Sequence, residues 1–221
     1  MIAKMVALDW RAMKFYQIRL LLLPVFIFAF GFYSPIAVIP MSVILVLSFS
    51  INPFAVEEKG ALNNLYLTLP VRRKSIVAGR YMLSIIMLLC GIAFGILIMP
   101  LANSFSISKW FIGTEGLLVI IALSYLLYAI LNLFMFPILF RLGYQKGKFW
   151  GFYLPMVFFA LLFGAYSAIT QLPEYKTLTL DFIVYASKNM LIVSGSIVVL
   201  ATVLLFLSYA ISLKLYSKRD F

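Results

Sequence analysis

Long apolar stretches alternate with short polar ones along most of this chain. Six of the stretches approach or exceed the roughly 20 mostly apolar residues that a transmembrane helix needs. They lie at residues 18–33, 35–51, 76–101, 116–140, 149–170 and 190–213. The first two are short and almost continuous, which predicts a tight hairpin. The pattern predicts an all-α polytopic membrane protein, with six transmembrane helices in a single domain over residues 1–221.

Composition supports a lipid environment. Hydrophobic residues make up 65% of the chain and charged residues 11%. Soluble domains have about 45–50% apolar and about 25% charged residues. The one cysteine, Cys90, lies within an apolar stretch, so no disulfide framework is expected. The absence of histidine from the sequence removes the usual metal ligand and the usual neutral-pH proton carrier, and no metal site is expected.

The basic residues indicate how the chain is oriented. The formal net charge is +11. If both termini lie on one side of the membrane, that side holds every one of the 18 Lys and Arg residues except Lys109, Lys176 and Lys188. Cytoplasmic loops collect Lys and Arg, so both termini are predicted to be cytoplasmic. This rule also explains the net charge, and no nucleic-acid partner is expected.

The chain begins with a stretch that has helical periodicity. Residues 1–17 are predicted to form a helix in the inner headgroup layer, with its cations on anionic lipid. An ordinary cytoplasmic helix or a disordered start is the alternative. Lys4, Ala7, Arg11 and Lys14 fall on one face of this helix, and Ile2, Met5, Val6, Met13 and Tyr16 on the other.

Residues 52–75, here called the polar segment, interrupt the apolar pattern between the second and third spans. Asn52 and Pro53 form a good helix start, and Glu57 and Glu58 follow near the positive end of the helix dipole. Both acids are expected to lie in water. Further along, an apolar stripe at helical spacing consists of Leu62, Leu65, Tyr66 and Leu69.

Two interpretations of the polar segment remain open on the residues alone. Its apolar stripe could fit a groove on a cytoplasmic ATPase, with the acids setting the register. It could instead rest on lipid or on its own helix bundle. The acids favour a protein partner, because anionic lipid repels them.

Ionisable residues are missing from the middle of every predicted span. Ion-coupled carriers, pumps and voltage sensors usually bury charges there. An intramembrane protease would need an Asp pair, a nucleophile with its base, or a zinc site. No catalytic residue is therefore expected. The milder polar residues in the spans are predicted to form interhelical hydrogen bonds, and they include Ser84, Ser124, Tyr125, Tyr128, Asn132, Ser167, Ser194 and Ser196.

Gly91 and Gly95 form a GxxxG pattern within the third predicted span. Such a pair lets two helices approach closely. It predicts a packing face for a second subunit, although the pattern is frequent in membrane helices.

A family resemblance appears between Asn52 and Tyr81. This string contains NPFAVEEK, LYLTLPVRRKSIV and GRY. It resembles the signature of the bacterial ABC transporter type-2 permease family, and it is similar to permeases of lantibiotic and phenol-soluble modulin exporters. Arg72 stands where that family usually has a small capping residue. The elements that match as they stand are Thr68-Leu69-Pro70, Arg73-Lys74 and Gly79-Arg80-Tyr81.

The resemblance implies a multi-pass permease of the bacterial cytoplasmic membrane that is not itself an enzyme. A second permease subunit, identical or related, would pair with it, and separate ABC ATPase subunits would bind ATP and Mg. Residues 171–188 would supply a short extracellular segment. The residues expected to couple to the ATPase are Phe54, Glu57, Glu58, Leu62, Leu65, Tyr66, Leu69 and Arg73.

The cargo expected from this resemblance is an amphipathic or antimicrobial peptide that leaves the cell. The chain contains 21 Phe and 13 Tyr and no charge near the middle of the predicted spans, which suits a hydrophobic substrate better than an ion or a sugar. The alternative is a non-transporting membrane scaffold or sensor that docks a cytoplasmic regulator. Only the exporter predicts ATP-dependent turnover.

Overall fold

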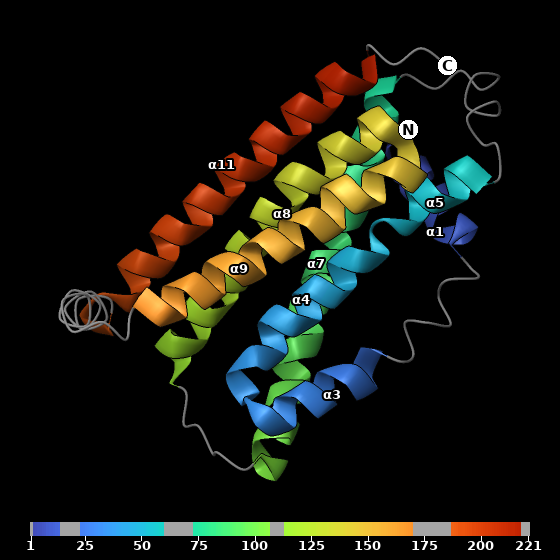
Figure 1. Ribbon diagram of the computed structural model, residues 1–221. Coiled ribbons are helices and arrows are strands. Elements are labelled where there is room, and N and C mark those ends of the chain that lie inside the picture. Colours follow the sequence, from blue (N-terminus) through green and yellow to red (C-terminus); the bar gives the residue numbers. More distant parts are fainter. Residues whose placement is uncertain (1, 14–22, 60–72, 107–112, 170–186, 218–221) are drawn as a thin grey trace.

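The computed structural model describes residues 2–13, 23–59, 73–106, 113–169 and 187–217, and the regular structure within these ranges is helical (Figure 1). The elements are α1 (Ile2–Ala12), α3 (Leu23–Tyr33), the 3-10 turn η1 (Pro35–Ala37), α4 (Val38–Phe49), α5 (Asn52–Lys59), α7 (Arg73–Phe105), α8 (Thr114–Lys148), the π-helical turn η2 (Phe149–Tyr153), α9 (Leu154–Ile169) and α11 (Met190–Ser217).

Four stretches of the described residues are long and apolar enough to cross a membrane. Helices α3 and α9, with 11 and 16 residues, are shorter than a usual span. The predicted all-helical membrane fold is therefore confirmed, whereas the arrangement of six spans stays a prediction. The four stretches are Pro35–Glu58, Arg73–Phe105, Thr114–Phe158 and Met190–Ser217.

The helices form a bundle in which α11 runs along α8 and α4 runs along α7 (Figure 1). One core joins α1, α4, α5, α7, α8 and α11 and is rich in aromatic rings such as Tyr128, Phe136 and Phe140. A second core lies between α3, α4 and α7 around Ile39 and Met87. Helices α7 and α11 each pack one face against the other helices, and many apolar side chains on their other face are exposed.

The close approach of α4 to α7 depends on Gly91 and Gly95. A Cβ added at position 95 would lie 2.7 Å from Ser42 Oγ and 3.0 Å from Ile39 Cα. Ser42 Oγ also lies 2.8 Å from the Gly91 carbonyl oxygen. The glycine pair thus has a helix partner within this chain, and its predicted use by a second subunit remains untested.

A glycine also ends the straight part of α8. Gly143 has φ 76° and ψ −174°, a backbone conformation that side chains with a Cβ rarely adopt. The chain turns here, and η2 packs back on α8 with Gly151 against Met135. The result is a hairpin that leads into α9.

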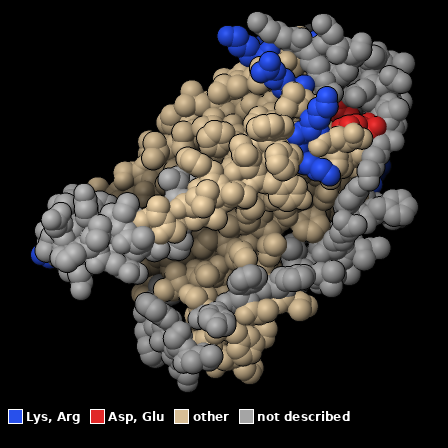
Figure 2. All heavy atoms as spheres, in the orientation of Figure 1, with Lys and Arg blue, Asp and Glu red and all other residues tan. Residues whose placement is uncertain are grey.

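Several contacts bring distant parts of the chain to one end of the bundle. Arg73 Nη1, at the start of α7, donates a hydrogen bond of 2.8 Å to the carbonyl of Ser217, at the end of α11. Helices α1 and α5 and the end of α8 lie at the same end, where Figure 2 shows Lys, Arg, Asp and Glu gathered. We call it the basic end. The predicted concentration of charges on one side agrees with this arrangement.

Helix α1 packs on the bundle at the basic end. Met5 of α1 and Met13, just after its end, belong to the predicted apolar face and are buried in the two cores, while Trp10 and Arg11 are exposed. At least part of that face is therefore covered by protein. The predicted position of α1 in the headgroup layer stays a prediction.

Candidate functional site: a buried charge cluster

A buried arginine lies where three helices meet at the basic end. Arg80 is in α7, seven residues after its start, and only 2% of it is exposed. Its Nη2 donates a hydrogen bond to Glu57 Oε2 of α5. Its Nε lies 3.9 Å from Asp9 Oδ2 of α1. One cation therefore joins two acids from two other helices.

Both acids are removed from water. Asp9 is 2% exposed and Glu57 is 4% exposed. The expectation that Glu57 lies in water is wrong, because α5 turns this side chain inward toward Arg80. Charges this deeply buried cost much free energy unless they are paired, so the loss of either partner would leave the other charge uncompensated.

Two aromatic rings complete the surroundings of the guanidinium group. Arg80 Cζ lies 4.1 Å from the ring centroid of Phe54 and 5.7 Å from that of Phe140. The two rings are themselves in edge-to-face contact, with centroids 4.9 Å apart. A guanidinium over an aromatic face gains from the ring quadrupole, most of all where water is excluded. Phe54, predicted as an ATPase contact, is buried in this cluster.

Glu58 faces in another direction from its neighbour. Its Oε2 accepts hydrogen bonds from the backbone N–H groups of Tyr144 and Gln145, at 2.6 and 3.1 Å. These amides follow the turn at Gly143, where the helical hydrogen-bond pattern is interrupted. Glu58 therefore acts like an N-cap for the last turn of α8, with its charge at the positive end of that turn.

The remaining predicted coupling residues divide into two groups. Arg73 is exposed at the start of α7, where it contacts the end of α11. Leu62, Leu65, Tyr66 and Leu69 lie outside the described residues. The structure therefore brings Phe54 and Glu57 together around Arg80. Glu58, the next residue of α5, contacts α8 instead, and Arg73 lies apart from all three.

A network of hydroxyl groups continues from the cluster into the bundle. The Tyr81 hydroxyl lies 2.6 Å from Ser208 Oγ and 2.8 Å from Ser212 Oγ, which connects α7 to α11. The Tyr128 hydroxyl lies 2.6 Å from Ser84 Oγ, which connects α8 to α7. The predicted interhelical hydrogen bonds are confirmed for Ser84, Tyr125, Tyr128 and Asn132. The prediction is wrong for Ser124, Ser194 and Ser196, whose hydroxyls donate to carbonyls of their own helix three or four residues earlier.

The sequence does not predict the pairing of Asp9 with Arg80. Arg80 enters the sequence analysis as one of the cytoplasmic bases and as part of GRY, whereas the acids, Asp9 among them, do not indicate an orientation. The signal for Arg80 was its place in GRY, next to Tyr81, inside a helix that is otherwise apolar around it. For Asp9, sequence offered only one acid within a basic stretch.

The cluster is a set of contacts between helices. Within the described ranges, no three His, Cys, Asp or Glu side chains come together as a metal site would require. The cluster instead holds α1, α5 and α7 together by charge, with rings from α5 and α8 around it.

The comparisons with known proteins agree with this architecture. The family model described as "ABC-2 family transporter protein" matches residues 1–217. Searches of curated proteins and of solved structures returned no match. Because the family match extends over nearly the whole chain and the described helices include four potential spans, this protein belongs to the ABC-2 transporter family and is a multi-pass membrane permease of an ABC transporter.

Proposed function

We propose that this permease forms the membrane path of an ATP-driven exporter for amphipathic or antimicrobial peptides. The observation that carries the proposal is the character of the bundle interior. Among the described residues between the charged ends of α7, α8 and α11, the buried polar side chains are hydroxyls and the amide of Asn132, surrounded by aromatic and aliphatic side chains. Such a path favours an apolar peptide over an ion, which would need fixed charges.

The charge cluster supports a route for coupling to an ATPase. In this proposal the ATPase binds the basic end, contacting α1 and the part of the polar segment that follows α5. Arg80 is bound to Asp9 and Glu57 from the two contacted elements. A movement of α1 or α5 that follows ATP binding would then shift α7, and the hydroxyl network would carry the shift to α8 and α11.

This proposal gives new roles to two predicted contact residues. Phe54 and Glu57 are buried, so they would transmit movement inside the permease and would not touch the ATPase in this conformation. The stripe Leu62, Leu65, Tyr66 and Leu69 remains the proposed contact surface. A second permease subunit, identical or related, would complete the path, and ATP with Mg would bind the ATPase subunits.

Reconstitution tests the proposal. The permease is purified from its native membranes in a mild detergent together with any ATPase that accompanies it, and placed in vesicles. A fluorescently labelled amphipathic helical peptide should move across the membrane with ATP and not with a non-hydrolysable analogue. If the vesicles hydrolyse ATP but the peptide distribution stays the same with ATP and with the analogue, the proposed peptide cargo is wrong.

The same preparation separates transport from the alternative role as a scaffold or sensor. A permease should carry an ATPase in about a one-to-one ratio and should alter its hydrolysis rate. A scaffold would bind a regulator that shows no nucleotide turnover. A chain that carries no nucleotide-binding partner after crosslinking would favour that second role.

A further inference from the structure

Two adjoining hollows lie along the seam between α7 and α11. The first, here called the basic hollow, has a volume of about 310 Å³ and lies at the basic end. Its described lining includes three cations, Arg73, Lys74 and Lys214, and no acid. The other described lining residues, such as Leu213 and Ser217, are uncharged. A hollow of this kind is suited to a phosphate group.

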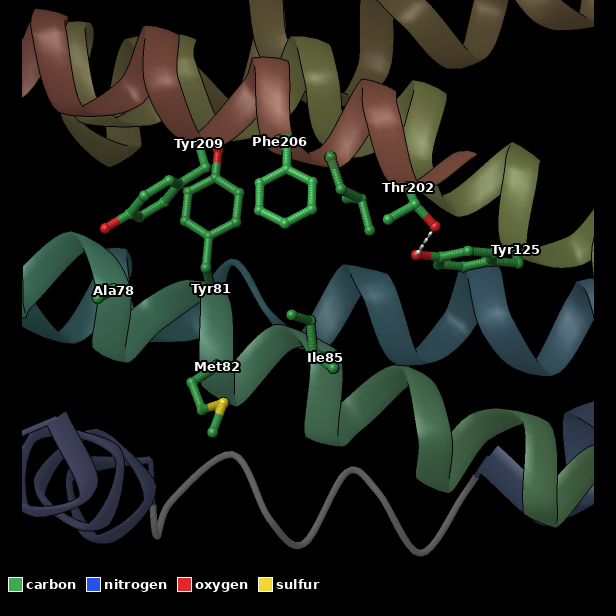
Figure 3. A pocket seen from close by; sticks show the side chains of 9 residues that line it. Ala78, Tyr81, Met82, Ile85, Tyr125, Thr202, Phe206 and Tyr209 are labelled. Carbon is green, nitrogen blue, oxygen red and sulfur yellow. Dashed lines mark hydrogen bonds between the residues drawn. The ribbon is translucent and has the colours of Figure 1, made fainter. Parts of the chain in front are cut away.

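The second hollow, here called the apolar groove, has a volume of about 390 Å³. Its lining is aromatic and aliphatic, with Tyr81 and Ile85 from α7 opposite Phe206 and Tyr209 from α11 (Figure 3). Phe206 is 69% exposed, so the groove opens toward the surroundings of the bundle. In a membrane, those surroundings are lipid tails.

The two hollows follow one another along the same two helices. On α7, Lys74 lines the basic hollow and Ala78, one turn later, lines the apolar groove. On α11, the neighbours Ala210 and Tyr209 line one hollow each. The seam from Lys74 to Ile85 is roughly 16 Å long at 1.5 Å per residue, close to the hydrocarbon depth of one leaflet, about 15 Å.

We propose that this seam binds an anionic phospholipid of the cytoplasmic leaflet. The phosphate headgroup lies in the basic hollow between Arg73, Lys74 and Lys214, and an acyl chain lies in the apolar groove. The hydrogen bond from Arg73 to the Ser217 carbonyl ties the two helix ends together at the headgroup position.

Charge and shape together select this occupant. A cationic amphipathic peptide would meet three like charges in the basic hollow, and a free phosphate would leave the apolar groove unused. A zwitterionic lipid would fit the groove but would gain less from the cations. A bound anionic lipid would hold α7 and α11 in register at the membrane surface, whatever cargo the permease carries.

Native mass spectrometry of the full chain in detergent tests the proposal. Phosphatidylglycerol is titrated against phosphatidylcholine of the same chain length. We expect a bound phosphatidylglycerol that survives delipidation better than phosphatidylcholine. Replacing Arg73, Lys74 and Lys214 together by Gln should weaken its binding roughly a hundredfold, at about fivefold for each basic residue near the surface.

Two matched controls keep the result specific. Replacing Arg141, Lys146 and Lys148 by Gln removes three exposed cations from the same end of the bundle, outside the hollow, and should leave the preference intact. Ala78→Phe fills the apolar groove without changing charge and should weaken binding, whereas Ala93→Phe, at an exposed position outside the groove on the same helix, should not. Helical circular dichroism shows whether each variant is folded.

Several outcomes would overturn the proposal. Equal retention of both lipids would mean ordinary annular lipid. Competition by inorganic phosphate, with no effect of Ala78→Phe, would mean a site for free anions. If the folded triple variant retained phosphatidylglycerol, the three cations would not form the binding site. If a second copy of the chain covered the seam, the seam would be a subunit interface.

Discussion

Glu57 of α5 and Arg80 of α7 form a buried ion pair, although 23 residues separate them in the chain. The pair connects a short helix of mixed polarity to a long apolar one. Asp9 approaches the same guanidinium from α1. Of the two acids that the sequence places in water, Glu57 is buried because it pairs with Arg80, whereas Glu58 is exposed.

Glu57→Gln should destabilise the permease far more than Glu58→Gln. Removing one partner of a buried ion pair costs about 3–5 kcal/mol, and Asp9 beside Arg80 should hold the loss near the lower value. Glu58→Gln keeps an oxygen that can accept from the Tyr144 amide, so its cost should be below about 1 kcal/mol. Thermal unfolding in detergent measures both, and equal losses would contradict the assignment of Glu57 to the interior.

Asp9→Asn should cost less than Glu57→Gln, because its carboxylate lies 3.9 Å from Arg80 Nε and makes the longer contact. The two changes should not be additive, since both acids share one cation. A double-mutant cycle on unfolding measures this coupling. Additive losses would show that α1 and α5 are held independently.

Gly143→Ala should destabilise the turn at the end of α8. Gly143 has φ 76° and ψ −174°, a backbone region that is nearly confined to glycine and costs a residue with a Cβ about 1–3 kcal/mol. Gly113→Ala is the matched control, because Gly113 has φ −67° and a Cβ there meets no atom within 4 Å. Chemical unfolding of both variants should show a loss for position 143 alone.

Gly95→Leu should separate α4 from α7, because even a Cβ at position 95 lies within 3.0 Å of the neighbouring helix. Overpacking of this kind typically costs about 1–3 kcal/mol. Gly195→Leu on α11 meets no atom within 4 Å of its Cβ and serves as the control. If Gly95→Leu instead left the fold intact and abolished only subunit pairing, the glycines would belong to a dimer interface.

Much of the membrane architecture could be predicted from the sequence. Apolar stretch length located the long helices α7, α8 and α11, because a span must bury its whole backbone in lipid and needs a minimum length. The helix start at Asn52 was predicted from a capping residue followed by proline, and α5 begins there. The family resemblance, carried by local motifs, is confirmed by the match over residues 1–217.

Tertiary structure alone decided the environment of individual polar side chains. Glu57 and Glu58 are adjacent and chemically identical, yet one is buried on Arg80 and the other caps the last turn of α8. Successive side chains on a helix point about 100° apart, so their surroundings depend on which elements pack on each face. Sequence determines that α5 forms and carries two acids, whereas the packing of α1, α7 and α8 around it determines what each acid does.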